Sequence, residues 1–289
     1  VGGFPEVVLS DWSIGKRILI EYFDDIITKD VASRYRADYG KIRDIAYYLI
    51  SNIGQRVTLR KIRNIFKIGL ETAQKYLHYL ETVYLIFQVK AFSEKVKEQL
   101  ISPRKIYAVD VGMANIAGFK VTENMGQALE NIVYLELKRR GHEVYYLKIN
   151  DKEVDFIAMK EGRVKEIINV CYDPTEEKTK KREIESLTAA LKKLKARKGL
   201  IITWEQEERI IKGEREIKLI PAYKANLKLV LREVRKILPL LRGTIIITAD
   251  HGEGLGKPLR PQDEPVFSHP CGRKEWELRI IPYTKITRK

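Results

Sequence analysis

Helices and strands alternate between residues 123 and 222, and this order constrains the fold more than any other feature of the chain. A helix is predicted at residues 128–140, where Gly141 can end it. A long basic helix is predicted at residues 176–195. Strands are predicted at residues 144–147, 154–159, 164–172, 200–204 and 217–220. Such alternation predicts an α/β unit in which helices cover a central mixed sheet.

The residues before this unit predict mostly helices. An amphipathic helix is expected at 14–36, because apolar residues recur there every three or four positions. The next elements are expected at residues 42–50 (helix), 59–67 (helix, capped by Thr58), 71–81 (helix) and 84–89 (strand). This order is typical of a winged helix-turn-helix, whose recognition helix would be residues 71–81. A winged helix that only packs between domains is the alternative.

DNA contacts are expected from the polar faces of the two helices of the turn. The candidates are Arg60, Lys61, Arg63, Lys67, Gln74, Lys75 and His78. A wing is expected from residues 83–90 and 95–107, with basic side chains placed for phosphates. These wing residues are Lys95, Lys97, Arg104 and Lys105.

Net charge points to a polyanionic partner. The 289 residues include 54 Lys and Arg against 39 Asp and Glu, a net charge of +15. Such a surface attracts nucleic acid, and a lysine-rich surface kept for solubility is the alternative. Cys171 and Cys271 fit neither a disulfide framework nor a zinc site, so a reducing, cytoplasmic compartment is expected. No apolar run is long enough to span a membrane, and no membrane partner is expected.

A group of acidic residues falls within the α/β unit. Asp155 lies on one predicted strand, Asn169 and Cys171 lie on the next, and Glu130 lies on the preceding helix. This layout resembles the restriction-endonuclease-like fold, whose active members use an Asp, a Glu-x-Lys and a Glu from the first helix. The resemblance implies two carboxylates that hold a divalent metal and a lysine that orients the attacking water.

The residues at two of these positions depart from that pattern. Asn169 and Cys171 stand where the resemblance calls for Glu and Lys. Glu130, Asp155, Asn169 and Cys171 are therefore candidates for a vestigial nuclease site, and no cofactor is expected. A weakly bound Mg²⁺, Mn²⁺ or Zn²⁺ is the alternative, with Lys148 or Lys165 as a migrated lysine.

An ordered series of motifs between residue 1 and about 222 resembles the C-terminal half of archaeal AAA-type ATPases. These motifs are Gly2-Gly3-Phe4-Pro5-Glu6, Tyr22-Phe23-Asp24-Asp25, Pro103-Arg104-Lys105-Ile106-Tyr107, Glu130-Asn131-Ile132-Val133, Glu153-Val154-Asp155-Phe156 and Asn169-Val170-Cys171-Tyr172-Asp173. The resemblance implies a P-loop ATPase core, a winged helix and a nuclease-like domain. No Gly-x-x-x-x-Gly-Lys-Ser/Thr motif occurs, so the ATPase core is expected to be absent.

The C-terminal residues resemble a different family. Asp250 and His251 follow a predicted strand at 244–248, and His269 comes later. This pattern resembles the metal-binding segment of the alkaline phosphatase and sulfatase superfamily, which implies these three residues as metal ligands. No nucleophile or upstream half of that site is present, so a remnant without activity is expected.

Together these patterns predict an α/β (α+β) protein with four segments. They are a helical connector (1–40), a winged helix (41–122), a degenerate restriction-endonuclease-like domain (123–222) and a phosphatase- or sulfatase-like tail (223–289). The leading hypothesis is a non-catalytic DNA-binding or accessory module. The alternatives are a metal-dependent nuclease that uses Asp155 and Glu130, a docking module for a separate ATPase or other protein, and a phosphatase or sulfatase fragment.

Overall fold

The structure of the protein, a computed structural model, describes residues 3–117, 125–225, 245–248 and 283–286. The chain forms two units, Val1–Ala225 and Asn226–Lys289. In the second unit β10 (Ile245–Thr248) pairs antiparallel with β11 (Tyr283–Ile286), which confirms the strand predicted at 244–248. The predicted metal ligands of the tail, Asp250, His251 and His269, lie outside the described residues.

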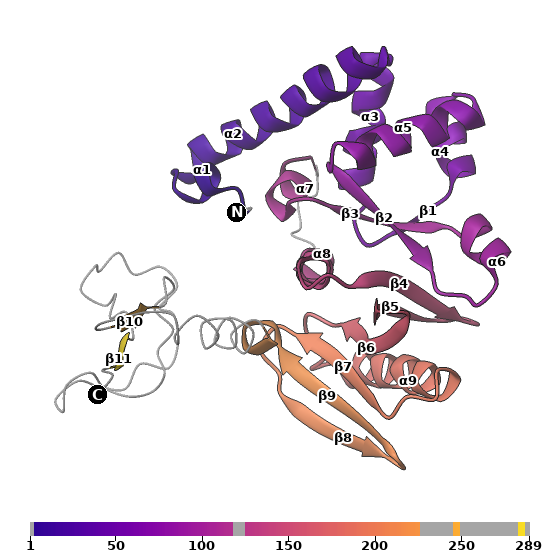
Figure 1. Cartoon of the computed structure of the whole chain (residues 1–289), viewed down its shortest axis with the longest axis vertical. Helices are drawn as coiled ribbons and strands as arrows, with labels where there is room; N and C mark the ends of the chain where they lie inside the picture. The colour runs from indigo at the N-terminus through magenta and orange to yellow at the C-terminus, as the bar shows by residue number, and fades with distance from the viewer. Residues whose placement is uncertain (1–2, 118–124, 226–244, 249–282, 287–289) are drawn as a thin grey trace. The chain divides into compact units, whose positions relative to one another are not determined.

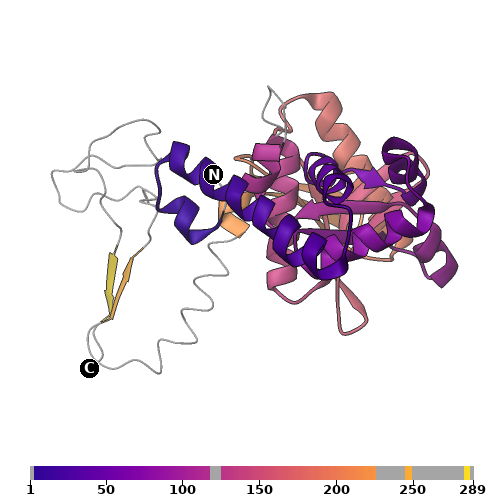
Figure 2. The same ribbon diagram turned by 90° about the horizontal axis from the view of Figure 1, so that it is seen from above.

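The N-terminal part of the first unit (residues 3–117) begins with helices, as predicted. Its first helices are α1 (Pro5–Val8), α2 (Trp12–Asp25), η1 (Ile26–Ser33) and α3 (Tyr39–Ile50). α2 and η1 form one continuous rod in Figures 1 and 2, which confirms the amphipathic helix predicted at 14–36. Leu19, Phe23 and Ile27 are spaced by four residues, so they lie on one face of the rod and are buried against α3 and the later helix α7 (Val111–Ala117).

Two short helices and three strands follow α3. They are β1 (Arg56–Val57), α4 (Leu59–Phe66), α5 (Leu70–Thr82), β2 (Ile86–Ala91) and β3 (Arg104–Ala108). α4 begins where the Thr58 hydroxyl accepts a 3.1 Å hydrogen bond from the Lys61 amide, the predicted cap. It ends at Lys67, whose positive φ of 49° stops the helix. The strands pair antiparallel in the order β1-β3-β2.

The hairpin of β2 and β3 continues into the sheet of the C-terminal part. β2 pairs in parallel with β4 (Glu143–Ile149) at Lys90–Tyr145 and Ala91–Tyr146. The prediction of a wing from residues 83–90 and 95–107, with basic side chains placed for phosphates, was therefore wrong in part. Between β2 and β3 the chain forms the short helix α6 (Val96–Ile101), and β3 itself is a buried central strand.

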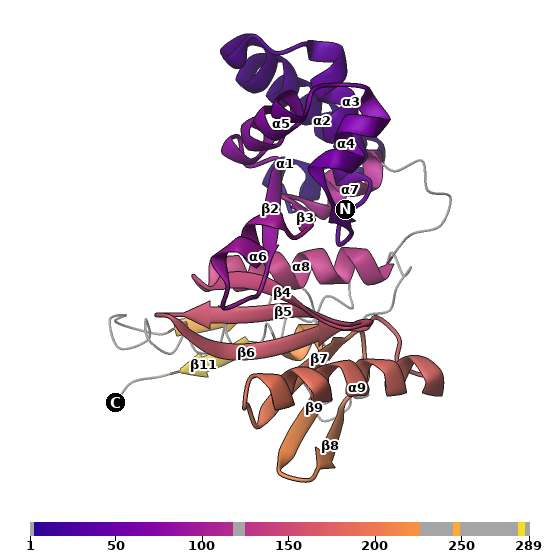
Figure 3. The same ribbon diagram turned by 90° about the vertical axis from the view of Figure 1, so that its right-hand side faces the viewer.

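The C-terminal part of the first unit (residues 125–225) supplies the rest of a nine-stranded mixed sheet, which confirms the predicted α/β class. Its order is β1-β3-β2-β4-β5-β6-β7-β9-β8. Helices α8 (Met125–Arg139) and α9 (Glu177–Lys193) lie on the two sides of the sheet in Figure 3. A further helix, α7 (Val111–Ala117), precedes α8. The remaining strands are β5 (Lys152–Lys160), β6 (Arg163–Val170), β7 (Lys198–Thr203), β8 (Glu208–Lys212) and β9 (Arg215–Pro221).

An irregularity in β5 determines how its acidic residues point. β4 advances two residues from Tyr145 to Leu147, while β5 advances three from Ile157 to Val154. β5 therefore holds one extra residue next to Asp155. Such a β-bulge bends the strand and redirects the neighbouring side chains.

Candidate functional site

A buried lysine lies at the centre of the acidic group of the α/β unit. The Lys105 Nζ atom is 2.9 Å from carboxylate oxygens of Glu130, Glu153 and Asp155. Only 3% of the Lys105 side chain is exposed. We call these four residues the Lys105 cluster. An ammonium group has three N–H donors, so each donor has a carboxylate partner.

Strands and a helix from both parts of the unit hold the cluster together. Lys105 lies on β3, which pairs with β1 at Arg56 and with β2 at Val89. Glu130 lies on α8, and Glu153 and Asp155 lie on β5. The Arg56 Nε atom also contacts Glu153, at 3.2 Å. The N-terminal part therefore supplies the positive charges, and the C-terminal part supplies the negative ones.

Glu130 is enclosed by groups from the N-terminal part. The buried Tyr107 hydroxyl donates a 2.6 Å hydrogen bond to its Oε1 atom. A Cβ atom at Gly54, whose φ is +74°, would lie 3.1 Å from its Oε2 atom. Burial, together with repulsion from Asp155, raises the pKa of Glu130 to about 7 despite the opposing effect of Lys105. Burial lowers the pKa of Lys105, but the surrounding carboxylates outweigh burial, and this pKa stays well above its ordinary value.

Asp155 is also held by the backbone. Its Oδ2 atom accepts a 2.9 Å hydrogen bond from the amide of Val170 on β6. The neighbouring Asn169 is fully buried, and its amide nitrogen donates a 2.8 Å hydrogen bond to the Glu183 carboxylate of α9. Burial and repulsion from Asp155 raise the pKa of Glu183, although Arg182 acts against them. Glu183 therefore brings to this region a carboxylate that the sequence pattern did not predict.

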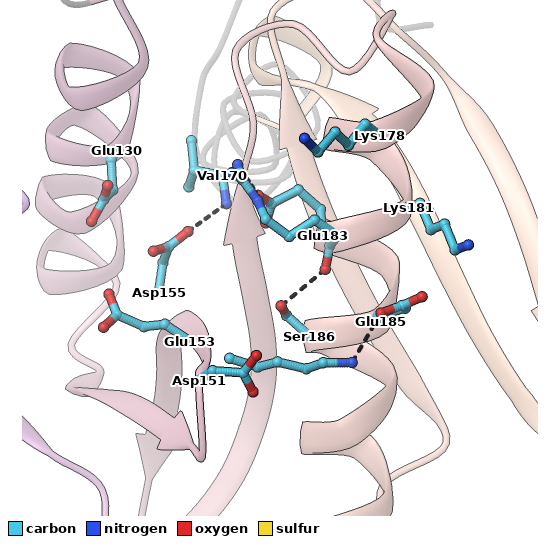
Figure 4. Close-up of a pocket in the computed structure, with 12 residues that line it drawn as sticks. Glu130, Asp151, Glu153, Asp155, Val170, Lys178, Lys181, Glu183, Glu185 and Ser186 are labelled. Carbon is cyan, nitrogen blue, oxygen red and sulfur yellow. Dashed lines mark hydrogen bonds and ion pairs between the residues drawn. The ribbon is translucent and has the colours of Figure 1, made fainter.

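A pocket of about 580 Å³ opens beside the cluster. In Figure 4, Glu130 and Asp155 point toward one another on one side of it, and α9 forms the other side. That helix contributes both signs of charge, from Lys178, Lys181 and Glu183 among others. The pocket therefore has an acidic side at Glu130 and Asp155 and a side of mixed charge on α9.

The structure brings together some of the predicted nuclease residues and separates others. Glu130 and Asp155 meet in the cluster, as predicted. Asn169 lies beside Asp155, but its side chain is already hydrogen-bonded. It donates to the Glu183 carboxylate and accepts from the Asp155 amide. Cys171 is buried in the apolar core under α9, where burial raises its pKa to about 11.

The candidates for a migrated lysine, Lys148 and Lys165, were wrong. Lys148 and Lys165 are exposed, and neither lines the pocket. The lysine that reaches Asp155 is Lys105, which had been expected to contact phosphates from a wing. Its burial rules out that contact. Arg104 is also engaged, because its guanidinium donates a 2.6 Å hydrogen bond to the Gln99 carbonyl.

Sequence reasoning missed the roles of Lys105, Glu153 and Tyr107 in this site. The signal that could have found them is a charged residue inside an apolar strand, because Lys105 is followed by Ile106, Tyr107 and Ala108. A lysine in a central strand needs a buried partner of opposite charge. That partner could then have been sought on β5.

The predicted DNA contacts lie on α4, at the Lys67 residue that ends it, and on α5. All seven are exposed: Arg60, Lys61, Arg63, Lys67, Gln74, Lys75 and His78. Lys75 forms a 2.7 Å ion pair with Glu71, and the Lys61 ammonium lies 5.9 Å from the centre of the Tyr48 ring. Both contacts are at the surface, so the charges are available to solvent.

Two family matches meet near the middle of the chain. Residues 1–123 match a domain of unknown function, DUF8612, and residues 121–212 match the family described as "Restriction endonuclease". The fold, the sheet and this match together show a restriction-endonuclease-like domain in the C-terminal half. The cluster is therefore built across the boundary of the two matches.

Two similar proteins are uncharacterized. A protein of Methanocaldococcus jannaschii is 37% identical over 243 residues, which cover 78% of this chain and 54% of its own length. A protein of Haemophilus influenzae is 36% identical over 169 residues, which cover 56% of this chain and 42% of its own length. The chain thus spans about half the length of the curated relatives it matches. No solved structure shows a significant match. No helix in the described part of the chain is long and apolar enough to cross a bilayer.

Restriction-endonuclease-like domains ordinarily use divalent metals, which carboxylate ligands hold. No three His, Cys, Asp or Glu residues within the described ranges are arranged to hold a metal ion. Asn169 and Cys171 are both buried, with Asn169 hydrogen-bonded to Glu183 and the thiol of Cys171 protonated at neutral pH. The carboxylates that remain are bonded to the Lys105 ammonium. These residues do not fit a divalent ion.

Proposed function

We propose that this protein binds DNA through helices α4 and α5 and that its restriction-endonuclease-like domain does not cleave. The observation that carries this proposal is the exposure of all seven predicted contact residues on α4, its C-cap and α5. The order α3-β1-α4-α5-β2-β3, with strands arranged β1-β3-β2, supports a winged helix with α5 in the major groove. The net charge of +15 adds the attraction of a positive surface for phosphates.

Lys75 and Arg63 provide the sharpest test. Both side chains are exposed, and an exposed ion pair such as Lys75–Glu71 contributes little to stability, so Lys75 is free to exchange Glu71 for a phosphate. The double variant Arg63→Gln/Lys75→Gln should bind duplex DNA more weakly whatever its sequence. Its plot of log affinity against log salt should be shallower by about 2, because each phosphate contact contributes about 1 to the slope.

The measurement is fluorescence anisotropy of a labelled duplex over a series of salt concentrations. Lys192→Gln/Lys193→Gln is the matched control, since it removes the same charge from exposed positions of α9. The control should keep most of the affinity. Equal affinities and slopes for the Arg63/Lys75 variant and the wild type would reject the interface.

The absence of cleavage is tested separately. Supercoiled plasmid incubated with Mg²⁺ or Mn²⁺ should remain intact. Nicking that disappears in Asp155→Ala would instead establish the metal-dependent nuclease. If the wild type binds no duplex even at low salt, the docking module for a separate ATPase becomes the leading function. Descent from an archaeal AAA-type ATPase and the phosphatase-like tail remain predictions.

A further inference from the structure

We propose that the Lys105 ammonium takes the place of the divalent cation of a nuclease site, so that the carboxylates hold the two parts of the fold together. The disagreement between the family's metal chemistry and this donor set motivates the proposal. It is independent of DNA binding by α4 and α5.

The geometry of the cluster is that of a bound cation. Three carboxylates from α8 and β5 converge on one nitrogen atom at equal distances of 2.9 Å. Two of them, Glu130 and Asp155, occupy the positions where the family's metal-binding residues are expected. The positive charge at this point comes from β3 of the N-terminal part.

The lysine cannot withdraw easily to admit a metal. β3 is paired on both edges, with β1 and with β2. Its end is fixed by Asn131, whose side chain accepts a 2.8 Å hydrogen bond from the Ala108 amide and donates one of 3.0 Å to the Ala108 carbonyl. The backbone of Lys105 is therefore fixed, and its ammonium could leave only if the side chain rotated away from all three carboxylate partners.

A divalent ion would therefore compete directly with the lysine. Mg²⁺ requires oxygen ligands at about 2.0–2.1 Å in nearly octahedral positions. An ammonium at hydrogen-bonding distance from the same oxygens both fills the space and repels the ion. Removing the ammonium should free these carboxylates for a metal.

The decisive experiment is a Mn²⁺ titration of the full chain, followed by isothermal calorimetry and by the electron paramagnetic resonance of free Mn²⁺. Wild type and Asp155→Asn should give superimposable curves, because no ion binds at the cluster in either protein. Binding common to both belongs elsewhere in the chain. Lys105→Met should gain a site at least tenfold tighter than any wild-type binding, and Lys105→Met/Asp155→Asn should lose it. Lys90→Met, on the adjacent strand, controls for loss of an exposed lysine.

Two results would overturn the proposal. One is a saturable Mn²⁺ site in the wild type that Asp155→Asn removes, which needs no Lys105 variant and so decides the matter even if Lys105→Met does not fold. The other is a Lys105→Met protein with a wild-type circular dichroism spectrum that binds no additional Mn²⁺. The first would show that a metal displaces the lysine, and the second that the carboxylates are not a cation site.

Discussion

Replacing Lys105 with Met should destabilise the fold more than any exposed lysine substitution. The change removes the positive partner of three carboxylates, whose side chains are 14%, 27% and 17% exposed for Glu130, Glu153 and Asp155. Removing one partner of a buried ion pair costs about 3–5 kcal/mol, because the remaining charge is left uncompensated. Partial exposure of Glu153 and Asp155 lets water stabilise them, so we expect the lower end, about 3 kcal/mol.

The loss should also depend on pH. Glu130 already has a pKa of about 7, and without the ammonium its protonated form becomes more favourable still. At pH 6 Glu130 is then neutral and fewer charges are uncompensated, so the penalty should be smaller than at pH 8. Substituting Glu130→Gln together with Lys105→Met should cost less than the sum of the single changes.

Urea unfolding followed by far-ultraviolet circular dichroism measures these differences from the shift of the midpoint. Lys90→Met is the control, because Lys90 is exposed on β2, and it should change stability by less than about 0.5 kcal/mol. A loss for Lys105→Met that matches this control, or one that is independent of pH, would refute the view that the cluster is a buried electrostatic clamp.

Three further predictions concern groups around the cluster. Asn131→Asp should destabilise by about 2 kcal/mol in urea unfolding, because an ionised Asp cannot donate to the Ala108 carbonyl and leaves it unsatisfied; Asn131→Gln changes length instead of chemistry and serves for comparison. Gly54→Ala should cost about 1–2 kcal/mol for its φ of +74° and should also crowd Glu130, whereas Gly162→Ala, at φ +69° with open space around it, should show only the backbone cost. The raised pKa of Glu130 means that the folded state holds a proton between pH 4.5 and about 7 that the unfolded state releases, so stability should fall as pH rises through this window. Glu130→Gln should flatten this dependence of stability on pH. An unchanged slope would contradict the assignment.

Local sequence patterns predicted the helices and strands whose apolar residues recur at regular spacing on one buried face. The Thr58 cap placed the start of α4, and the apolar spacing in residues 176–195 predicted α9 within two residues at each end. β8 was missed because four of its five residues are exposed and the fifth is half-buried, so no alternation marks it. The pattern of buried and exposed residues is what sequence periodicity reports, and an exposed hairpin strand lacks it.

The site was harder to predict because its parts are distant in the chain. Glu130 and Asp155 were found from their positions on a predicted helix and strand. Lys105 was assigned to a wing, since nothing local reveals that β2 would pair with β4 and that Lys105 would reach the carboxylates of β5. The bulge that redirects Asp155 depends on pairing between strands and leaves no mark in a single strand.

The parallel pairing of β2 with β4 means that the boundary between the two family matches is not a boundary in space. A fragment that began near residue 123 would lose β2 and leave the edge of β4 unpaired. It would also lose Lys105 and expose the acidic centre of the domain. Open strand edges promote aggregation. Each part of the chain therefore needs the other to complete its sheet and its cluster. A recombination event that replaced one part would have to supply a compatible β2–β3 hairpin as well.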